Sequence, residues 1–319
     1  MSEAFPKALW DEIQEYSTPQ LTAEEVAAEE FASEQQLAKR RENLLVSAAT
    51  MAKKLYPKQS FLIGPKLFPK GGKMLITAEN GTGKSALVTY IAACLATGKP
   101  MFDMYYKLKG SANYGEPIFP VHGNSYVMVV DYEIPEHIRQ GLRLAPLREN
   151  FEGDFLGNLA YAKHPSNYRL ENERNSQPNL GSFDKFLQLV AETKPDVLII
   201  DPFSSTHSLD ENSNMIKQAL NNIDKMVDYT GTSVILVHHA STKLLRDNKG
   251  MEIEKNAKEK ARGHSAITDW PDVHLQINAL KSSQIAVKHL EIDFGKTRYC
   301  EKPNPIVITA DIQNMSFTG

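Results

Sequence analysis

The chain has 319 residues, enough for one large α/β domain with an appendage or for two domains of about 150 residues each. Hydrophobic residues make up 41% and charged residues 24%, so the composition excludes a mainly disordered chain. The net charge of −3 speaks against a nucleic-acid partner. No apolar run reaches the ~18 residues of a membrane helix and no signal-peptide pattern is present, so we expect a cytoplasmic protein without membrane contact.

The charge is unevenly distributed along the chain. The first fifty residues hold ten acidic and four basic side chains, a net charge of −6, which leaves +3 for the remainder. From Thr22 to Ala52 there is no Gly or Pro, and Thr22 with Glu25 forms a capping box, so this run predicts a helix. We therefore expect an acidic helical arm over residues 1–55 and a second domain over residues 56–319.

Short β-branched runs alternate with helical stretches from about residue 60 onward. Four runs have a continuous apolar stretch, which is typical of parallel strands buried on both faces: 73–77, 125–130, 196–200 and 233–237. Three later runs alternate polar and apolar residues and predict antiparallel strands that extend the sheet: 273–277, 289–294 and 305–309. The sequence thus predicts an α/β fold with a mostly parallel central sheet, and polar functional loops over 101–124 and 241–262. The two cysteines, Cys94 and Cys300, are too few for a disulfide scaffold or a cysteine zinc site.

A glycine-rich turn follows the first of these strands and opens a helix with Gly83-Lys84-Ser85. Glycines let backbone N–H groups close around phosphates, Lys84 would reach the β and γ phosphates, and the Ser85 hydroxyl would bind Mg²⁺. The first glycine of this P-loop motif is Ala78 here, which requires a negative φ at that position. We expect ATP and Mg²⁺ as ligands, with phosphate-binding residues Glu79, Asn80, Gly81, Thr82, Gly83, Lys84, Ser85 and Ala86.

Carboxylates end two of the predicted buried strands. Asp201 follows the strand 196–200, and an acid beside a P-loop can hold Mg²⁺ through water. Asp131 and Glu133 follow the strand 125–130, and hydrolysis needs a carboxylate to orient and deprotonate the attacking water. Because both side chains would point to the same side of an extended strand, spacing leaves open which one is the base. The alternative is that Asp131 and Glu133 have no catalytic role and only stabilise the start of a helix after Pro135.

Two histidines, His238 and His239, follow the strand 233–237. Neighbouring side chains of a strand face opposite ways, so at most one of the two imidazoles faces the nucleotide. A histidine pair without cysteines or spaced carboxylates is a poor metal site.

These elements, in this order, resemble the RecA-like P-loop ATPases, in the branch that includes RepA-type plasmid replicative helicases and, more distantly, DnaB-type hexameric helicases. The resemblance covers about residues 60–300. It implies that Glu133 is the base, that Asp201 is the Walker B acid and that His239 senses the γ-phosphate. The matching stretches are 68–85, 129–135, 200–203, 237–241 and 261–266, the last with His264 in place of a serine.

Phe294-Gly-Lys296-Thr-Arg298 follows a late strand and resembles the Lys-x-Arg pair that hexameric helicases insert into a neighbour's nucleotide site. A guanidinium supplied in trans would stabilise the charge that develops on the γ-phosphate. The resemblance therefore implies a ring with nucleotide sites between subunits and an inactive monomer. The alternative is that Lys296 and Arg298 are two surface bases on a loop.

Seven basic and four acidic residues lie between Ser241 and Ser265, a local charge of +3. In RecA-like proteins the loop at this place faces the central channel. A local basic patch is sufficient for contact with the phosphates of single-stranded DNA, and the loop has no aromatic residue for base stacking. The expected DNA-binding residues are Lys243, Arg246, Lys249 and Arg262; the alternative is a solvated loop.

We expect an oligomeric, hexameric ATP-dependent motor on single-stranded DNA, with replicative helicase as the leading role and other replication proteins as partners. One alternative is a recombinase or repair ATPase that forms filaments on DNA, since Phe5-Pro-Lys-Ala8 fits the Phe-x-x-Ala pattern that links some recombinase protomers. A second alternative is an ATP-switched regulator that binds a protein partner through the acidic arm.

Overall fold

The computed structural model describes residues 47–53, 60–107, 109, 112–151, 155–171, 182–211, 214–240, 245–246, 252–253, 265–280 and 287–319. The chain divides into two units, Met1–Lys58 and Gln59–Gly319, and each is described by itself. In the first unit the structure describes helix α3 (Ala48–Lys53), at the end of the predicted helical run; the rest of the predicted arm lies outside the described residues. None of the helices in the described ranges is long and apolar enough to cross a membrane.

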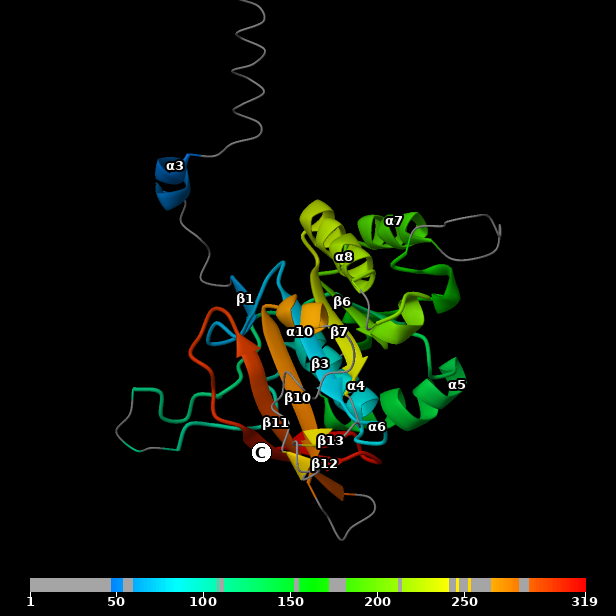
Figure 1. Cartoon of the computed structure of the whole chain (residues 1–319). Helices are drawn as coiled ribbons and strands as arrows, with labels where there is room; N and C mark the ends of the chain where they lie inside the picture. Colours follow the sequence, from blue (N-terminus) through cyan, green and yellow to red (C-terminus); the bar gives the residue numbers. More distant parts are fainter. Residues whose placement is uncertain are drawn as a thin grey trace, which may run out of the picture. The chain divides into compact units, whose positions relative to one another are not determined.

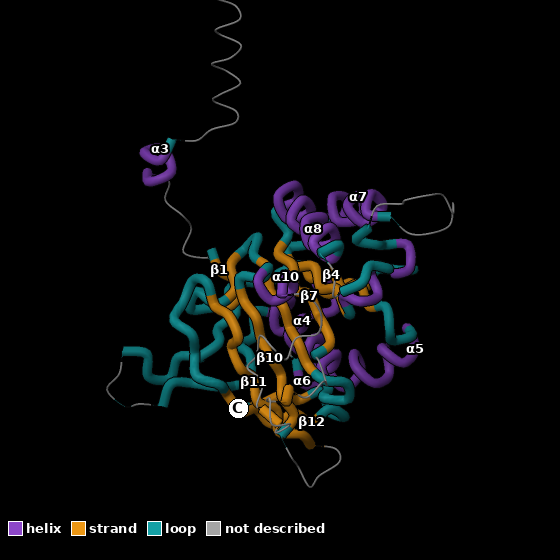
Figure 2. Tube along the Cα trace, in the orientation of Figure 1, coloured by secondary structure: helices purple, strands orange, loops and turns teal. Residues whose placement is uncertain are grey.

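A nine-stranded sheet forms the centre of the second unit (Figures 1 and 2). Its parallel part has the order β10 (Val273–Ala279), β3 (Lys73–Ala78), β7 (Ser233–His239), β6 (Val197–Asp201), β4 (Val127–Asp131) and β5 (Leu159–Tyr161). Beyond β10, the antiparallel strands β11 (Val287–Thr297), β12 (Ile306–Asp311) and β13 (Ser316–Thr318) continue the sheet. The predicted mostly parallel sheet with antiparallel C-terminal strands is confirmed, with one correction: the run 273–277, expected as an antiparallel strand, pairs in parallel with β3 and only its other edge pairs antiparallel, with β11.

Helices cover both faces of the parallel strands, which explains why β4, β6 and β7 have long apolar runs. In β3, Met74 and Ile76 pack on one side with α4 (Lys84–Thr97), whose residues are almost all buried. Leu75 points to the other side and belongs to the cluster formed with α7 (Phe183–Thr193), α8 (Ile216–Thr230) and α10 (Ser265–Asp269). The carboxyl ends of all six parallel strands therefore meet at one edge of a two-faced core.

The segment after β4 consists of three short helical elements that follow one another directly (Figure 1). They are α5 (Glu136–Arg139), the π-helical turn η1 (Gln140–Leu144) and α6 (Ala145–Asn150). The remaining described elements are two small ribbons, β1 (Phe61–Ile63) with β2 (Phe68–Pro69) and β8 (Leu245–Arg246) with β9 (Glu252–Ile253), and the 3₁₀ turns η2 (Phe155–Asn158), η3 (Pro165–Asn167) and η4 (Phe203–Thr206).

Two strands extend further than the sequence predicts. Strand β7 includes His238 and His239, because both continue the hydrogen-bonded register with β3. Strand β11 runs to Thr297, so Lys296 lies inside the strand and not on a loop after it, which corrects that expectation. The register shift between His274 and Leu275 leaves Gly295 as the extra residue of a β-bulge, which lets the strand continue past the glycine.

Candidate functional site

The P-loop lies between β3 and α4, as the sequence predicts. Gly81 and Gly83 have φ values of 75° and 100°, which a residue with a Cβ rarely adopts. Ala78 is not among the residues with positive φ and is buried as the last residue of β3, so alanine fits in place of the usual glycine. Gly83 is the N-cap of α4 and carries no side chain, which leaves the first N–H groups of the helix for an anion.

Lys84 is the first residue of α4 and is buried against the end of β7. Its Nζ donates to Nδ1 of His239 at 3.1 Å and to the carbonyl oxygen of His238 at 3.4 Å. Burial lowers the pKa of Lys84, and the nearby carboxylates of Asp201 and Glu133 act in the opposite direction. The ammonium group is therefore held between the P-loop, the end of β7 and the two acids.

Asp201 ends β6 and is 5% exposed. Burial raises its pKa to about 6, opposed by a hydrogen bond with the Ser85 side chain and by the charge of Lys84. Its Oδ1 atom is buried and has no hydrogen-bond partner in the described part of the chain. A carboxylate with one unpaired oxygen beside a hydroxyl is an oxygen donor set of the kind that Mg²⁺ prefers, so these two residues fit the ion.

Asp131 and Glu133 differ in how their oxygens are used. Oδ1 of Asp131 accepts the backbone N–H groups of Glu133 and Ile134, both at 3.0 Å, and Oδ2 pairs with Nε of Arg139 at 3.1 Å. Both oxygens of this buried carboxylate thus hold the turn after β4. The Glu133 side chain is 48% exposed, and its Oε1 lies 3.7 Å from Nε2 of His239. Only Glu133 of the two keeps a carboxylate directed toward the site.

The two histidines at the end of β7 face opposite sides of the sheet, as strand alternation requires. His239 lies between Lys84 and Glu133, on the nucleotide side. His238 is fully buried on the other side, where its Nδ1 is 3.9 Å from Oε1 of Glu211 and its ring packs edge-on against Phe203.

Lys296 and Arg298 lie at the opposite end of the sheet from the P-loop. The backbone N–H of Arg298 donates to the Asp272 carbonyl, and Asp272 in turn bonds to Lys73 at the start of β3. That start is separated from Ala78 by the length of β3, roughly 17 Å at ~3.3 Å per residue. Nη1 of Arg298 is paired with Asp272 at 3.2 Å, and Nζ of Lys296 donates to the Asp269 carbonyl at 2.5 Å. The structure therefore does not bring these two cations to the site of their own chain.

The expected DNA-binding residues fall on the least described part of the chain. Lys243, Lys249 and Arg262 lie outside the described residues. Arg246 belongs to β8, where its backbone pairs with Glu252 of β9, and its side chain is outside the description.

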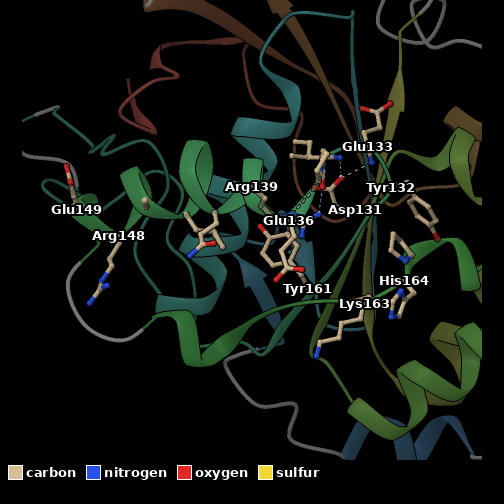
Figure 3. Close-up of a pocket in the computed structure, with 17 residues that line it drawn as sticks. Asp131, Tyr132, Glu133, Glu136, Arg139, Arg148, Glu149, Tyr161, Lys163 and His164 are labelled. Carbon is tan, nitrogen blue, oxygen red and sulfur yellow. Dashed lines mark hydrogen bonds and ion pairs between the residues drawn. The ribbon is translucent and has the colours of Figure 1, made fainter.

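A cavity of about 1350 Å³ opens beside Asp131 and Glu133, along the carboxyl ends of β4 and β5 (Figure 3). Arg139 lies at its centre, with its guanidinium 4.3 Å above the ring of Tyr161. The cavity has a mixed charge, because it is also lined by Glu136, Arg148, Glu149, Lys163 and His164.

Several residues at the site carry no sequence motif. Nζ of Lys288, at the start of β11, donates to the Gly81 carbonyl of the P-loop. The side chain of Ile312 covers Gly83 so closely that a Cβ there would lie 2.9 Å from it. Arg139 and Arg143 come from the helical segment after β4. No local sequence pattern links Lys288 or Ile312 to the P-loop, because more than 200 residues separate them from it. The fold alone brings them there.

The sequence matches the model of a family described as an AAA domain over residues 38–243. A search of curated proteins gave no match. Among solved structures, the chain is similar to one described as an ATPase domain, with 13% identity over 78% of this chain and 84% of that one and a TM-score of 0.48. It is also similar to a KaiC-like protein from Pyrococcus horikoshii OT3, with 17% identity over 83% and 98% of the two chains and a TM-score of 0.47.

The strand order and the P-loop placement described above are those of a RecA-like P-loop ATPase core. The family match includes β3, α4, β4, β6 and β7, and it also covers Glu133, which follows β4, so it contains all the residues that meet around Lys84. Since this match spans more than half of the sequence, the chain belongs to the AAA-domain family of P-loop ATPases.

Proposed function

We propose that the protein is an ATP-hydrolysing ring, a hexamer, that moves on single-stranded DNA in the cytoplasm as a replicative helicase. The observation that carries this proposal is the separation of two sets of charged groups. Lys84, Asp201, Glu133 and His239 meet at one end of the sheet, whereas the Lys-x-Arg pair lies at the other end. Because these two cations do not reach the nucleotide site of their own chain, they could act on the nucleotide of another subunit, as the resemblance to hexameric helicases implies.

At the carboxyl end of the sheet, the chain would bind ATP through the backbone N–H groups of residues 79–86 and the ammonium of Lys84. Ser85 and Asp201 would hold Mg²⁺, which, when bound, would offset the negative charge of the phosphates. Glu133 is the group we assign to orient the attacking water and take its proton, because the oxygens of Asp131 are engaged in the turn.

His239 connects these groups. Its Nδ1 accepts from Lys84 and its Nε2 faces Glu133, so a phosphate that binds Lys84 competes directly with the imidazole. We assign His239 as the residue that reports the γ-phosphate to β7 and to the basic loop that follows it. That loop, with Lys243, Arg246, Lys249 and Arg262, is where we expect DNA to bind, and the acidic arm over residues 1–55 remains a separate predicted element.

Unwinding of a forked DNA duplex with ATP is the decisive test, combined with the mass of the assembly in solution. We expect ATP hydrolysis to be stimulated by single-stranded DNA and to lose that stimulation as salt is raised. Stimulated hydrolysis on filaments without unwinding would favour the recombinase alternative. Hydrolysis or nucleotide binding that ignores DNA altogether would favour an ATP-switched regulator and would contradict the motor.

A further inference from the structure

Arg143 is a charged side chain near the site that neither a motif nor the resemblance marks. It belongs to η1, the π-helical turn between α5 and α6, ten residues after Glu133. Single π-helical turns between α-helical segments are frequent at functional sites, because they rotate the following side chains out of the regular helical register. The turn directs Arg143 inward, and its side chain is partly buried although the neighbouring Gly141 and Leu142 are exposed.

The guanidinium of Arg143 has almost nothing to bind within the described part of the chain. Its Nε is buried and has no hydrogen-bond partner there, and its Nη1 contacts the thioether sulfur of Met315 at 4.0 Å. A thioether is a weak acceptor, whereas a guanidinium offers five N–H donors. A buried donor without an acceptor costs about 1–3 kcal/mol, so this arrangement does not serve the stability of the fold.

Arg143 lies beside the nucleotide site. The residue that it contacts, Met315, is three residues after Ile312, whose side chain lies against Gly83 of the P-loop. Burial lowers the pKa of Arg143, and the carboxylates of Asp131 and Asp201 are the main groups that oppose this shift. Both oxygens of Asp131 already accept hydrogen bonds, from two backbone N–H groups and from Arg139. Asp201 keeps Oδ1 without a partner among the described residues, so it does not bind Arg143 through that atom either. The cation is therefore held beside the acids without a direct ion pair to either of them.

We propose that Arg143 binds the phosphate chain of the nucleotide that occupies the P-loop of the same subunit, as a second cation in addition to Lys84. A phosphate oxygen is the acceptor that the described part of the protein does not supply, and the planar guanidinium matches phosphate with paired N–H donors. The inference rests on the proposed ATP site but not on DNA or on the ring. Arg298 would act only between subunits, whereas Arg143 contributes to nucleotide binding within one chain.

The test compares Arg143→Ala and Arg143→Lys with Arg148→Ala. Arg148 is the matched control, because it is a second arginine of the same helical segment, is exposed and lines the large cavity. The dissociation constants of a non-hydrolysable ATP analogue and of ADP are measured by fluorescence titration, and the melting temperature is measured without nucleotide. We expect Arg143→Ala to weaken binding of the analogue at least tenfold and Arg143→Lys to weaken it less, since lysine keeps the charge.

The melting temperature separates a ligand-binding role from a structural one. Removal of a buried cation without an acceptor is expected to leave the melting temperature of Arg143→Ala unchanged or to raise it. Equal affinities of Arg143→Ala and wild type overturn the proposal, and so does a melting temperature that falls by several degrees. A wild-type protein that binds the analogue but ignores DNA would contradict the motor and leave this proposal in place. A wild-type protein that binds no nucleotide would overturn both.

Discussion

The two ends of the central sheet differ in how far their polar groups are satisfied. At the carboxyl end, Oδ1 of Asp201 and Nε of Arg143 have no hydrogen-bond partner among the described residues. At the amino end, Arg298 pairs with Asp272 and Lys296 donates to a backbone carbonyl. A fold that leaves polar atoms of one end unsatisfied loses stability there, and a ligand can restore it. The comparison teaches that the carboxyl end is built for a ligand.

The ion pair at the amino end joins an exposed side chain to a buried one. The Arg298 side chain is 49% exposed, whereas the Asp272 side chain is 6% exposed and also accepts from the backbone N–H of Lys73 and from the Tyr299 hydroxyl. Because Asp272 keeps these two donors, the proposed ring would allow Arg298 to leave Asp272 for the phosphates of a neighbour.

The largest expected effect comes from the change Glu133→Gln at the carboxyl end. The amide keeps the size of the side chain but cannot take a proton, so turnover should fall by about 10²–10⁴ while ATP binding is retained. Phosphate release and nucleotide titration measure the two quantities. Glu136→Gln, an exposed change that lines the same cavity, is the control and should hydrolyse ATP at the wild-type rate. Retained hydrolysis in Glu133→Gln would move the base to another group.

The second prediction concerns nucleotide sites that two subunits of the proposed ring would share, one through Lys84 and the other through Arg298. Lys84→Ala lacks the phosphate cation and Arg298→Ala lacks the cation supplied in trans, so each variant alone should be inactive. When the two are co-expressed in equal amounts, about a quarter of randomly formed interfaces combine an intact Lys84 with an intact Arg298. ATPase activity should return to about that fraction of the wild-type rate. An Arg298→Ala protein with normal activity, or a mixture that stays inactive, contradicts sites shared between subunits.

The third prediction separates structure from chemistry at the carboxyl end. Asp131→Asn removes the buried ion pair with Arg139. The side chains of Asp131 and Arg139 are 8% and 11% exposed, so this change should lower the free energy of unfolding by about 3 kcal/mol. Urea denaturation measures this loss. Lys302→Gln breaks the more exposed pair with Asp293 and should cost less than about 1 kcal/mol. If Asp131→Asn is as stable as wild type but inactive, Asp131 and not Glu133 carries the chemistry.

Much of the carboxyl end could be predicted from the sequence, because its residues directly follow apolar strands. The P-loop, Asp201 and Glu133 each stand at the end of such a run, and parallel strands bring their carboxyl ends together. Strand alternation likewise separates His238 from His239. These inferences depend only on where each strand ends and on the alternation of its side chains, so they do not depend on how the helices pack.

The residues that the sequence could not indicate reach the site through packing. Arg143 arrives on a π-helical turn, and no periodic pattern distinguishes that turn from an ordinary helix. Lys288 contacts Gly81 because β11 runs antiparallel to β10, which places its first residues beside the P-loop. The same reversal carries Lys296 to the far end of the sheet, a position that follows from the strand direction and not from the motif around Arg298.

The smallest expected effect concerns His274, which lies in β10 in register with Lys296. Burial lowers its pKa to about 4, and its Nε2 is 2.8 Å from Oγ1 of Thr77. In the unfolded chain the His274 imidazole takes up a proton near pH 6.5, whereas in the folded chain it does so only near pH 4. The contribution of His274 to the free energy of unfolding is therefore fully present above pH 6.5 and is lost as the pH falls toward 4. Between pH 7.5 and 5 this loss is roughly 2 kcal/mol.

Urea denaturation of His274→Gln should show a pH dependence weaker by that amount. His207, whose pKa burial also lowers, contributes equally to both proteins. Identical pH dependence in the two proteins would mean that His274 titrates alike in the folded and unfolded chain, and that this buried polar contact between β3 and β10 does not exclude water.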